Sequence, residues 1–246
     1  MSNRENFAVV LVRPKASGNV GAAARALKNM GLSDLRVVAP RDWDAQAAKI
    51  MAVHADDVLE NARCYPTLIE SIKDCTLTVG TTCRSGPYKS EIKPIRQAAQ
   101  ELAIAADVNR IALVFGPEDH GLSNEEIGQC HWLATIPSAP DYPSLNLAQA
   151  VMVVAYEIAQ ACAAASSNSV PVEFASAEGV EQMFERMADA LKAIGFVSED
   201  NAEHMMLTIR TMLGRAGLRP RELNILNGLA RQIRWFGEGG PRSHRA

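Results

Sequence analysis

Short apolar runs alternate with segments of helical periodicity over the first two thirds of the chain. The runs have the length of buried strands and lie at 7–13, 35–39, 76–80, 111–115 and 133–136. Segments with helical spacing separate them, and the first, 18–30, is predicted to end at Gly31 because glycine favours the position after a helix. This alternation predicts an α/β fold, a mainly parallel sheet with helices on both faces.

The pattern changes after residue 165. Small and polar residues with a proline fill 166–178, which is typical of a linker. Apolar residues at helical spacing follow from Val180 to Ile194, and further helices are expected at 204–213 and after Pro220. We therefore predict an α/β domain at 1–165, a linker at 166–178 and a small helical domain at 179–246.

Two predicted strands end in segments rich in glycine, proline and small polar residues, 113–123 and 136–150. A buried strand that ends in this way usually opens on a ligand crevice, and open α/β sheets bind ligands at the carboxyl ends of their strands. A third strand end, 79–87, has the same character. The sequence thus predicts one site formed by several loops at one edge of the sheet.

Composition excludes several classes of protein. The hydrophobic share of 48% and charged share of 22% are those of an ordinary globular chain. The most apolar run, 148–165, contains Gln149, Glu157 and Gln160, so we expect no membrane span, and the polar start of the chain predicts no signal peptide and a cytoplasmic protein. Five scattered cysteines without a CxxC pair predict free thiols and no metal site.

The net charge of −3 conceals a gradient along the predicted helical domain. Positions 171–203 contain eight acidic residues and only two basic ones, Arg186 and Lys192. From position 204 onward the chain contains eight arginines, no lysine and only two acidic residues, Glu222 and Glu238. Arginine binds phosphate through a planar fork and stacks on bases, so this tail favours RNA, although a solvated helix surface explains it too.

The first strand leads into a glycine-containing helix start, Ser17-Gly-Asn-Val-Gly, the position where anionic ligands meet a helix. The spacing is not GxGxxG, and Gly21 could simply allow close helix packing. Arg25 stands in a helix that is otherwise apolar and could be either a surface salt bridge or a phosphate ligand. The neighbouring cations Arg13, Lys15 and Lys28 favour phosphate.

The other strand ends carry further polar candidates. Arg84 and Lys89 follow the third strand end and could reach a polyanion. Ser123 and Glu126 are predicted to form a capping box. His120 could be a base or a solvated loop residue. Ser144 and Asn146 both stand where a helix begins, which is more than capping requires.

Together these residues resemble the three successive motifs of the SPOUT methyltransferases, SpoU (TrmH-like) branch. The motifs are Asn19 with Arg25, then 115–118 with 121–123, then 136–137 with 144–148. The tail from Arg219 to Leu229 is similar to that of bacterial tRNA 2′-O-methyltransferases that act on nucleotide 32 of the anticodon loop. The resemblance implies a C-terminal trefoil knot, which periodicity could not have shown.

The resemblance also implies the chemistry, transfer of a methyl group from S-adenosyl-L-methionine (AdoMet) to a ribose 2′-hydroxyl without a metal. The implied catalytic residues are Arg25, Asn19, Glu118, Ser144 and Asn146. The implied cofactor contacts are Thr81, Thr82, Cys83, Gly116, Ile136, Pro143, Ser144 and Leu145. Because a guanidinium stays protonated, we expect Arg25 to bind the target phosphate and stabilise charge on the 2′-oxygen rather than act as a base.

Members of this branch work as homodimers, so a homodimer that binds tRNA is expected. The predicted RNA contacts are Arg13, Lys15, Arg84, Lys89, Arg215, Arg219 and Arg221, and the helical domain would bind RNA or support the dimer. The alternatives are 2′-O-methylation of another tRNA position or of rRNA, and an RNA-binding protein of the same fold that has no catalytic activity. A nucleotide-dependent oxidoreductase is disfavoured, because no acidic ribose ligand follows the second strand at Ala39-Pro-Arg41.

Overall fold

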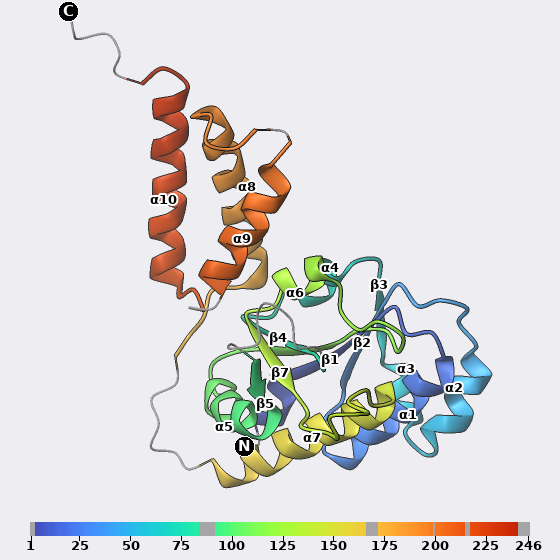
Figure 1. Cartoon of the computed structure of the whole chain (residues 1–246). Helices are drawn as coiled ribbons and strands as arrows, with labels where there is room; N and C mark the ends of the chain where they lie inside the picture. Colours follow the sequence, from blue (N-terminus) through green and yellow to red (C-terminus); the bar gives the residue numbers. More distant parts are fainter. Residues whose placement is uncertain (1–2, 84–91, 166–171, 199, 215–216, 241–246) are drawn as a thin grey trace, which may run out of the picture.

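The protein contains a parallel sheet whose strands run in the order β3-β2-β1-β6-β4-β7-β5 (Figure 1). The computed structural model describes residues 3–83, 92–165, 172–198, 200–214 and 217–240. The strands are β1 (Phe7–Val12), β2 (Asp34–Val38), β3 (Arg63–Tyr65), β4 (Leu77–Thr81), β5 (Ile92–Pro94), β6 (Ile111–Phe115) and β7 (Trp132–Thr135). Every pairing between neighbouring strands is parallel, as the sequence predicted.

Helices cover both faces of the sheet (Figure 1). Alternate residues of β1 divide the core: Phe7, Val9 and Leu11 belong to one apolar cluster, and their neighbours belong to the other. The first cluster lies under α1 (Ser17–Asn29), α3 (Asp56–Glu60), α5 (Ile95–Ala105) and α7 (Leu147–Ala164), with α2 (Ala45–Ala52) packed on α1. The second lies under α4 (Leu68–Ile72) and α6 (Asn124–Gly128), and a 3-10 turn, η1 (Asn3–Asn6), precedes β1.

The predicted strands and the first helix lie within two residues of their observed limits. Gly31 follows α1 with a φ of +71°, which confirms it as the residue that ends the helix. Gly21 permits close packing, because a Cβ there would stand 1.9 Å from the carbonyl oxygen of Ala48 in α2. The sequence reading missed β3 and β5, which have three residues each and are too short for a periodic pattern.

The chain after the sheet forms a separate helical bundle of α8 (Ala177–Ala193), α9 (Ala202–Gly214) and α10 (Pro220–Gly237). Its own core includes Met183, Phe184 and Met187. The bundle rests on α4 and α6 of the sheet domain, where a Cβ at Gly128 would meet Leu207 at 2.8 Å. Helix α8 begins at Ala177, two residues before the predicted start of the helical domain at 179.

Part of the predicted linker is bound to the sheet domain. Asn109 donates to the carbonyl of Val172 at 2.7 Å and accepts from the amide of Phe174 at 2.9 Å, and Trp132 packs edge-on against Phe174. The amide of Ala177 donates to the carbonyl of Cys75 at 2.8 Å. These contacts seat the start of α8 against the sheet domain.

Helix α7 is long and apolar enough to cross a membrane, judged by length and composition only. Here one face of it belongs to the core, with Val151, Val154 and Ile158 buried beside α1 and α5. Strand β7, which leads into α7, lies between β4 and β5. The connection from β4 to β5 contains residues 84–91, outside the described part of the chain, so the trefoil knot stays a prediction.

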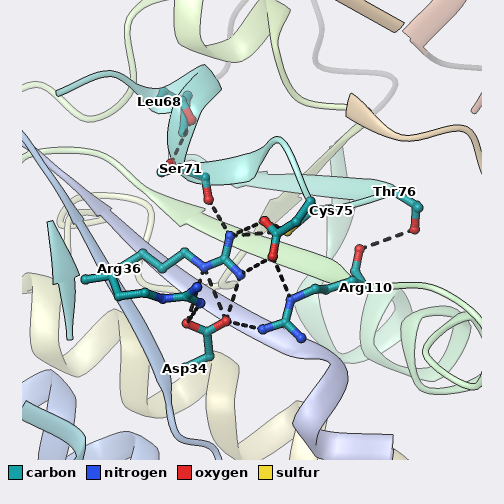
Figure 2. A network of polar contacts seen from close by, with 9 residues as sticks. Asp34, Arg36, Leu68, Ser71, Cys75, Thr76 and Arg110 are labelled. Atoms are coloured by element: carbon teal, nitrogen blue, oxygen red, sulfur yellow. Dashed lines mark hydrogen bonds and ion pairs between the residues drawn. The ribbon is translucent and has the colours of Figure 1, made fainter. Parts of the chain in front are cut away.

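A buried ion-pair network at the amino-terminal edge of the sheet centres on Arg36 of β2 (Figure 2). The Arg36 side chain is fully buried and donates to Asp34 at 2.8 Å, to Asp74 at 2.5 Å and to the carbonyl of Ser71. Arg63 and Arg110 also pair with Asp34. Burial alone would raise the pKa of Asp34, but the hydrogen bonds from Arg36 and Arg63 outweigh it and lower the pKa to about 2.

We expect Arg36→Met to destabilise the fold by about 3 kcal/mol, because it leaves buried carboxylate charge without its central partner. Arg63→Met, which removes a half-exposed partner of the same Asp34, should cost under about 1 kcal/mol. Urea unfolding measures both. Since the folded pKa of Asp34 is lowered, its contribution is present above about pH 4 and is lost as the pH falls towards 2. Equal losses in the two variants would contradict this ranking.

Candidate active site at the carboxyl ends of the strands

Two loops meet where the sheet order reverses direction. Strand β1 lies between β2 and β6, and the chain continues from β1 towards β2 but from β6 towards β7 on the other side. The loop after β1 (residues 13–16) and the loop after β6 (116–123) therefore leave the same edge as neighbours. Parallel sheets usually bind ligands at such a point.

A directed chain of hydrogen bonds joins three of the predicted catalytic residues. Asn146 caps α7 by accepting from the amides of Ala148 and Gln149, which leaves its own amide group to donate to Asn19 Oδ1 at 3.0 Å. Asn19 Nδ2 in turn donates to Glu118 Oε1 at 2.6 Å. The carboxylate, an acceptor only, thereby fixes the orientation of both amides.

Glu118 also binds the start of the other loop. The amides of Lys15 and Ala16 donate to its carboxylate at 3.0 and 3.4 Å. Burial would raise the pKa of Glu118, but the hydrogen bonds from Lys15, Asn19 and Ala16 outweigh it and hold the pKa below its usual range. Glu118 is therefore an ionised organising group at neutral pH rather than a proton donor.

A cavity of about 250 Å³ opens beside this chain. All eight predicted cofactor contacts line it, together with Phe115, Pro117, Glu118, Asp119, His120, Gly121, Leu122, Leu147 and Ala150. The cavity brings together the ends of β4, β6 and β7 and the start of α7. Contact of these residues with a cofactor stays a prediction. The walls of the cavity suit AdoMet, because apolar side chains can pack on an adenine ring and backbone groups nearby can form hydrogen bonds with it.

Gly116 forms a part of the wall where no side chain fits. A Cβ at this position would stand 2.2 Å from the carbonyl carbon of Gly121 and the amide nitrogen of Leu122. The glycine therefore lets the loop fold back on itself and face the cavity with backbone alone. The sequence did not predict Phe115, Pro117 and Leu122 as cavity residues. Phe115 and Pro117 adjoin Gly116 in the sequence, which could have indicated them, whereas Leu122 reaches it only through the folded loop.

Arg25 and Ser144 stand apart from the hydrogen-bonded chain. Ser144 lines the cavity and does not cap α7, a role that Asn146 fills alone. Arg25 lies outside the cavity lining, is exposed on α1, and makes no hydrogen bond or ion pair with any described residue. The surface salt bridge considered from the sequence is thus absent from the described part of the chain.

The predicted RNA contacts have different surroundings. Arg13 pairs with Glu126 and Lys15 with Asp119. Arg219 and Arg221 are exposed at the start of α10. Arg84, Lys89 and Arg215 lie outside the described residues.

Other candidate residues near the site have the following surroundings in the structure. Ser123 and Glu126 form the predicted capping box of α6. His120 lines the cavity and lies 2.7 Å from Asp119, so it is not purely solvated. All five cysteines are free, and the described residues contain no group of three His, Cys, Asp or Glu side chains able to hold a metal.

The comparisons with known proteins agree with this geometry. The SpoU rRNA methylase family model matches residues 6–156, and the model of the tRNA methyltransferase TrmJ C-terminal domain matches residues 178–243. The first covers more than half of the chain and includes every element of the sheet and the cavity. The chain therefore belongs to the SpoU methylase family and carries a TrmJ-type C-terminal domain.

Its relatives include one well-defined enzyme. The chain is 36% identical over 240 residues to the tRNA (cytidine/uridine-2′-O-)-methyltransferase TrmJ of Escherichia coli strain K12, covering 96% of this chain and 98% of that one. The crystal structure of TrmJ from Z. mobilis ZM4 has a TM-score of 0.80 at 34% identity, covering 92% and 98% of the two chains. A probable methylase from Haemophilus influenzae Rd KW20 gives 0.63 at 33% identity, covering 94% and 96%.

We expect Gly116→Ala to weaken AdoMet binding at least about tenfold, because the added methyl group forces the 116–122 loop away from its position. Isothermal titration measures the affinity, and circular dichroism checks that the fold is kept. Gly228→Ala is the matched control, because a Cβ at Gly228 would meet nothing within 4 Å and this glycine lies in α10 of the helical domain, outside the cavity lining. Equal AdoMet affinity in Gly116→Ala and wild type would contradict the role given to this loop.

Proposed function

We propose that this protein is a tRNA methyltransferase that transfers a methyl group from AdoMet to the ribose 2′-hydroxyl of a cytidine or uridine at position 32 of the anticodon loop. The observation that carries the proposal is the Glu118–Asn19–Asn146 chain beside a cavity lined by all eight predicted cofactor residues, within a full-length relative of TrmJ. A cytoplasmic location fits such a substrate.

AdoMet supplies an electrophilic methyl group on its sulfonium, so the protein's task is to place the 2′-oxygen and balance its charge. Thr81, Thr82, Cys83, Gly116, Ile136, Pro143, Ser144 and Leu145 would hold the cofactor. Glu118 keeps Asn19 and Asn146 in fixed orientations at the cavity rim. Arg25 binds the target phosphate and stabilises negative charge that develops on the 2′-oxygen.

The position of Arg25 supports a homodimer as the working form. Its guanidinium is exposed and does not line the cavity of its own subunit, so it is available to the cavity of a second copy. Mixing Arg25→Ala with Gly116→Ala subunits tests this, because one site of the mixed dimer then combines an intact Arg25 with an intact cavity. Activity well above that of either variant alone supports the arrangement, and no gain on mixing contradicts it.

The helical domain offers a cationic groove for the body of the tRNA. A groove of about 580 Å³ between α8 and α10 is lined by Arg186, Asn224, Asn227, Gly228, Arg231 and Arg234. Arg186 donates to Asn227 at 2.9 Å, and Arg231 has no hydrogen bond or ion pair with a described residue, whereas Arg234 is paired with Glu238. The guanidiniums of Arg186 and Arg231 therefore pair with no carboxylate of the described residues and are available to phosphate.

Gly228 supports close approach to this groove. Glycine in the interior of a helix costs up to about 1 kcal/mol relative to alanine. A Cβ at Gly228 would meet nothing within 4 Å, so packing inside the protein does not require the glycine. A partner's backbone passing over α10 would require it.

Separate incubations of the protein and AdoMet with bulk tRNA and with rRNA, followed by mass spectrometry of nuclease fragments, test the proposed function. A new 2′-O-methyl group at nucleotide 32 is expected. A new methyl group found only at another tRNA position, or only in rRNA, would show that the target is not nucleotide 32. If neither RNA gains a methyl group, the alternative of an RNA-binding protein without catalytic turnover would stand.

We expect Arg25→Ala to lose methyl transfer almost completely while AdoMet affinity stays within about twofold. Arg25→Lys should recover little of the rate, because an ammonium cannot reproduce the planar fork on a phosphate. Steady-state methylation and isothermal titration measure the two quantities. Full methylation by Arg25→Lys at neutral pH would exclude the need for a guanidinium.

In the helical domain we expect Gly228→Ala to raise the melting temperature and yet weaken tRNA binding, a combination that a purely structural glycine would not produce. Arg231→Gln should weaken binding and lower the salt dependence by about one phosphate contact. Lys192→Gln is the control, because Lys192 is exposed on α8 and does not line the groove. Filter binding at several salt concentrations measures the affinities, and unchanged binding in Gly228→Ala would argue against the groove.

A further inference from the structure

Two ion pairs join the loop after β1 to the segment after β6. The guanidinium of Arg13 donates to both carboxylate oxygens of Glu126, with 3.1 Å between Nη2 and Oε2. Lys15 Nζ pairs with Asp119, and this ammonium holds the pKa of Asp119 well below its usual range. These contacts add to the two backbone amides that bind Glu118, so the loop 13–16 meets three carboxylates of one neighbouring segment.

The Arg13–Glu126 pair is sheltered and geometrically specific. The Glu126 side chain is only 7% exposed, whereas that of Arg13 is 30% exposed. Glu126 also accepts from the amide of Ser123 in the capping box, so a second contact besides Arg13 holds its carboxylate in place. An RNA phosphate that took Arg13 would leave a buried carboxylate without its cation, which is costly.

The backbone of Arg13 is held in an unusual conformation at the same point. Its φ is +46°, a region that residues with a Cβ seldom occupy. Its amide donates to the carbonyl of Val38 at 2.8 Å at the end of the neighbouring strand. Such strain persists where surrounding contacts over-determine it, and it is concentrated at functional sites.

We infer that Arg13 and Glu126, assisted by Lys15 and Asp119, are positioning residues for methyl transfer. They fix the start of α1, which carries Asn19 and Arg25, against the segment that forms one wall of the cavity. The inference rests on the proposed function, since it names what aligns the two halves of that site. It also gives Arg13 and Lys15 a role other than contact with RNA.

The test compares Arg13→Gln with wild type in three measurements: kcat at saturating AdoMet and tRNA, tRNA affinity across a salt series, and hydrogen exchange of the amides of residues 15–20. We expect kcat to fall about ten- to a hundredfold, because small misplacements of reacting groups have effects of this size. Affinity for tRNA and its salt dependence should stay unchanged. Exchange at the start of α1 should become faster.

Three further variants separate positioning from general stability. Arg13→Lys should recover part of kcat, because an ammonium keeps the ion pair without the fork. Arg13→Gly relieves the strained φ but leaves Glu126 without its cation, so the fold should be more stable than that of Arg13→Gln while kcat stays equally low. Arg96→Gln is the control: Arg96 also makes a two-pronged pair, with Glu157, but on α5 and α7 away from the cavity, and kcat should not change.

Two outcomes would overturn the inference. Weaker tRNA binding with a salt dependence reduced by about one contact would show that Arg13 binds RNA phosphate. Unchanged kcat together with unchanged exchange would show that the pair positions nothing. Failure of the proposed function has a different signature, namely wild-type protein that methylates no RNA, and exchange at residues 15–20 would then decide the positioning role alone.

Discussion

The site depends on one carboxylate at the point where the sheet order reverses. Glu118 accepts from the backbone of the loop after β1 and from Asn19, which accepts in turn from Asn146 at the start of α7. Three segments far apart in the sequence thus converge on a group that can only accept hydrogen bonds. Because each donor also lies at a helix start, this single acceptor ties the start of α1 to the start of α7, in addition to the apolar packing of the two helices.

This arrangement separates two tasks in space. The cavity side, built from the ends of β4, β6 and β7, presents apolar walls and backbone, which suits an adenine-containing cofactor. The α1 side presents Arg25, a guanidinium that no described residue neutralises. The helical domain rests on α4 and α6, across the sheet from α1 and α7, and adds a cationic groove. In the proposed function, the helical domain would hold the RNA while the target ribose meets the sheet domain.

Much of this could be predicted from the sequence because the relevant signals are local. Buried strands, glycine at a helix end and the Ser123–Glu126 capping box each follow from a few neighbouring residues. The short edge strands gave no periodic signal. Arg36 stands in an apolar strand, and its burial depends on Asp34 of the same strand and on Asp74 and Arg110 from two other segments. Likewise, the pairing of Arg13 and Lys15 with carboxylates needs the register of β1 beside β6, which residue spacing does not contain.

The most direct test of this account is the single-turnover rate of methyl transfer in Glu118→Gln with AdoMet and tRNA both saturating. Glutamine keeps the size of the side chain, but one of its two acceptor groups becomes a donor that faces the Lys15 amide or the Asn19 amide group. The account predicts a folded protein that still binds AdoMet and transfers methyl about a hundredfold more slowly. A rate equal to that of wild type would contradict the claim that this carboxylate aligns the two halves of the site.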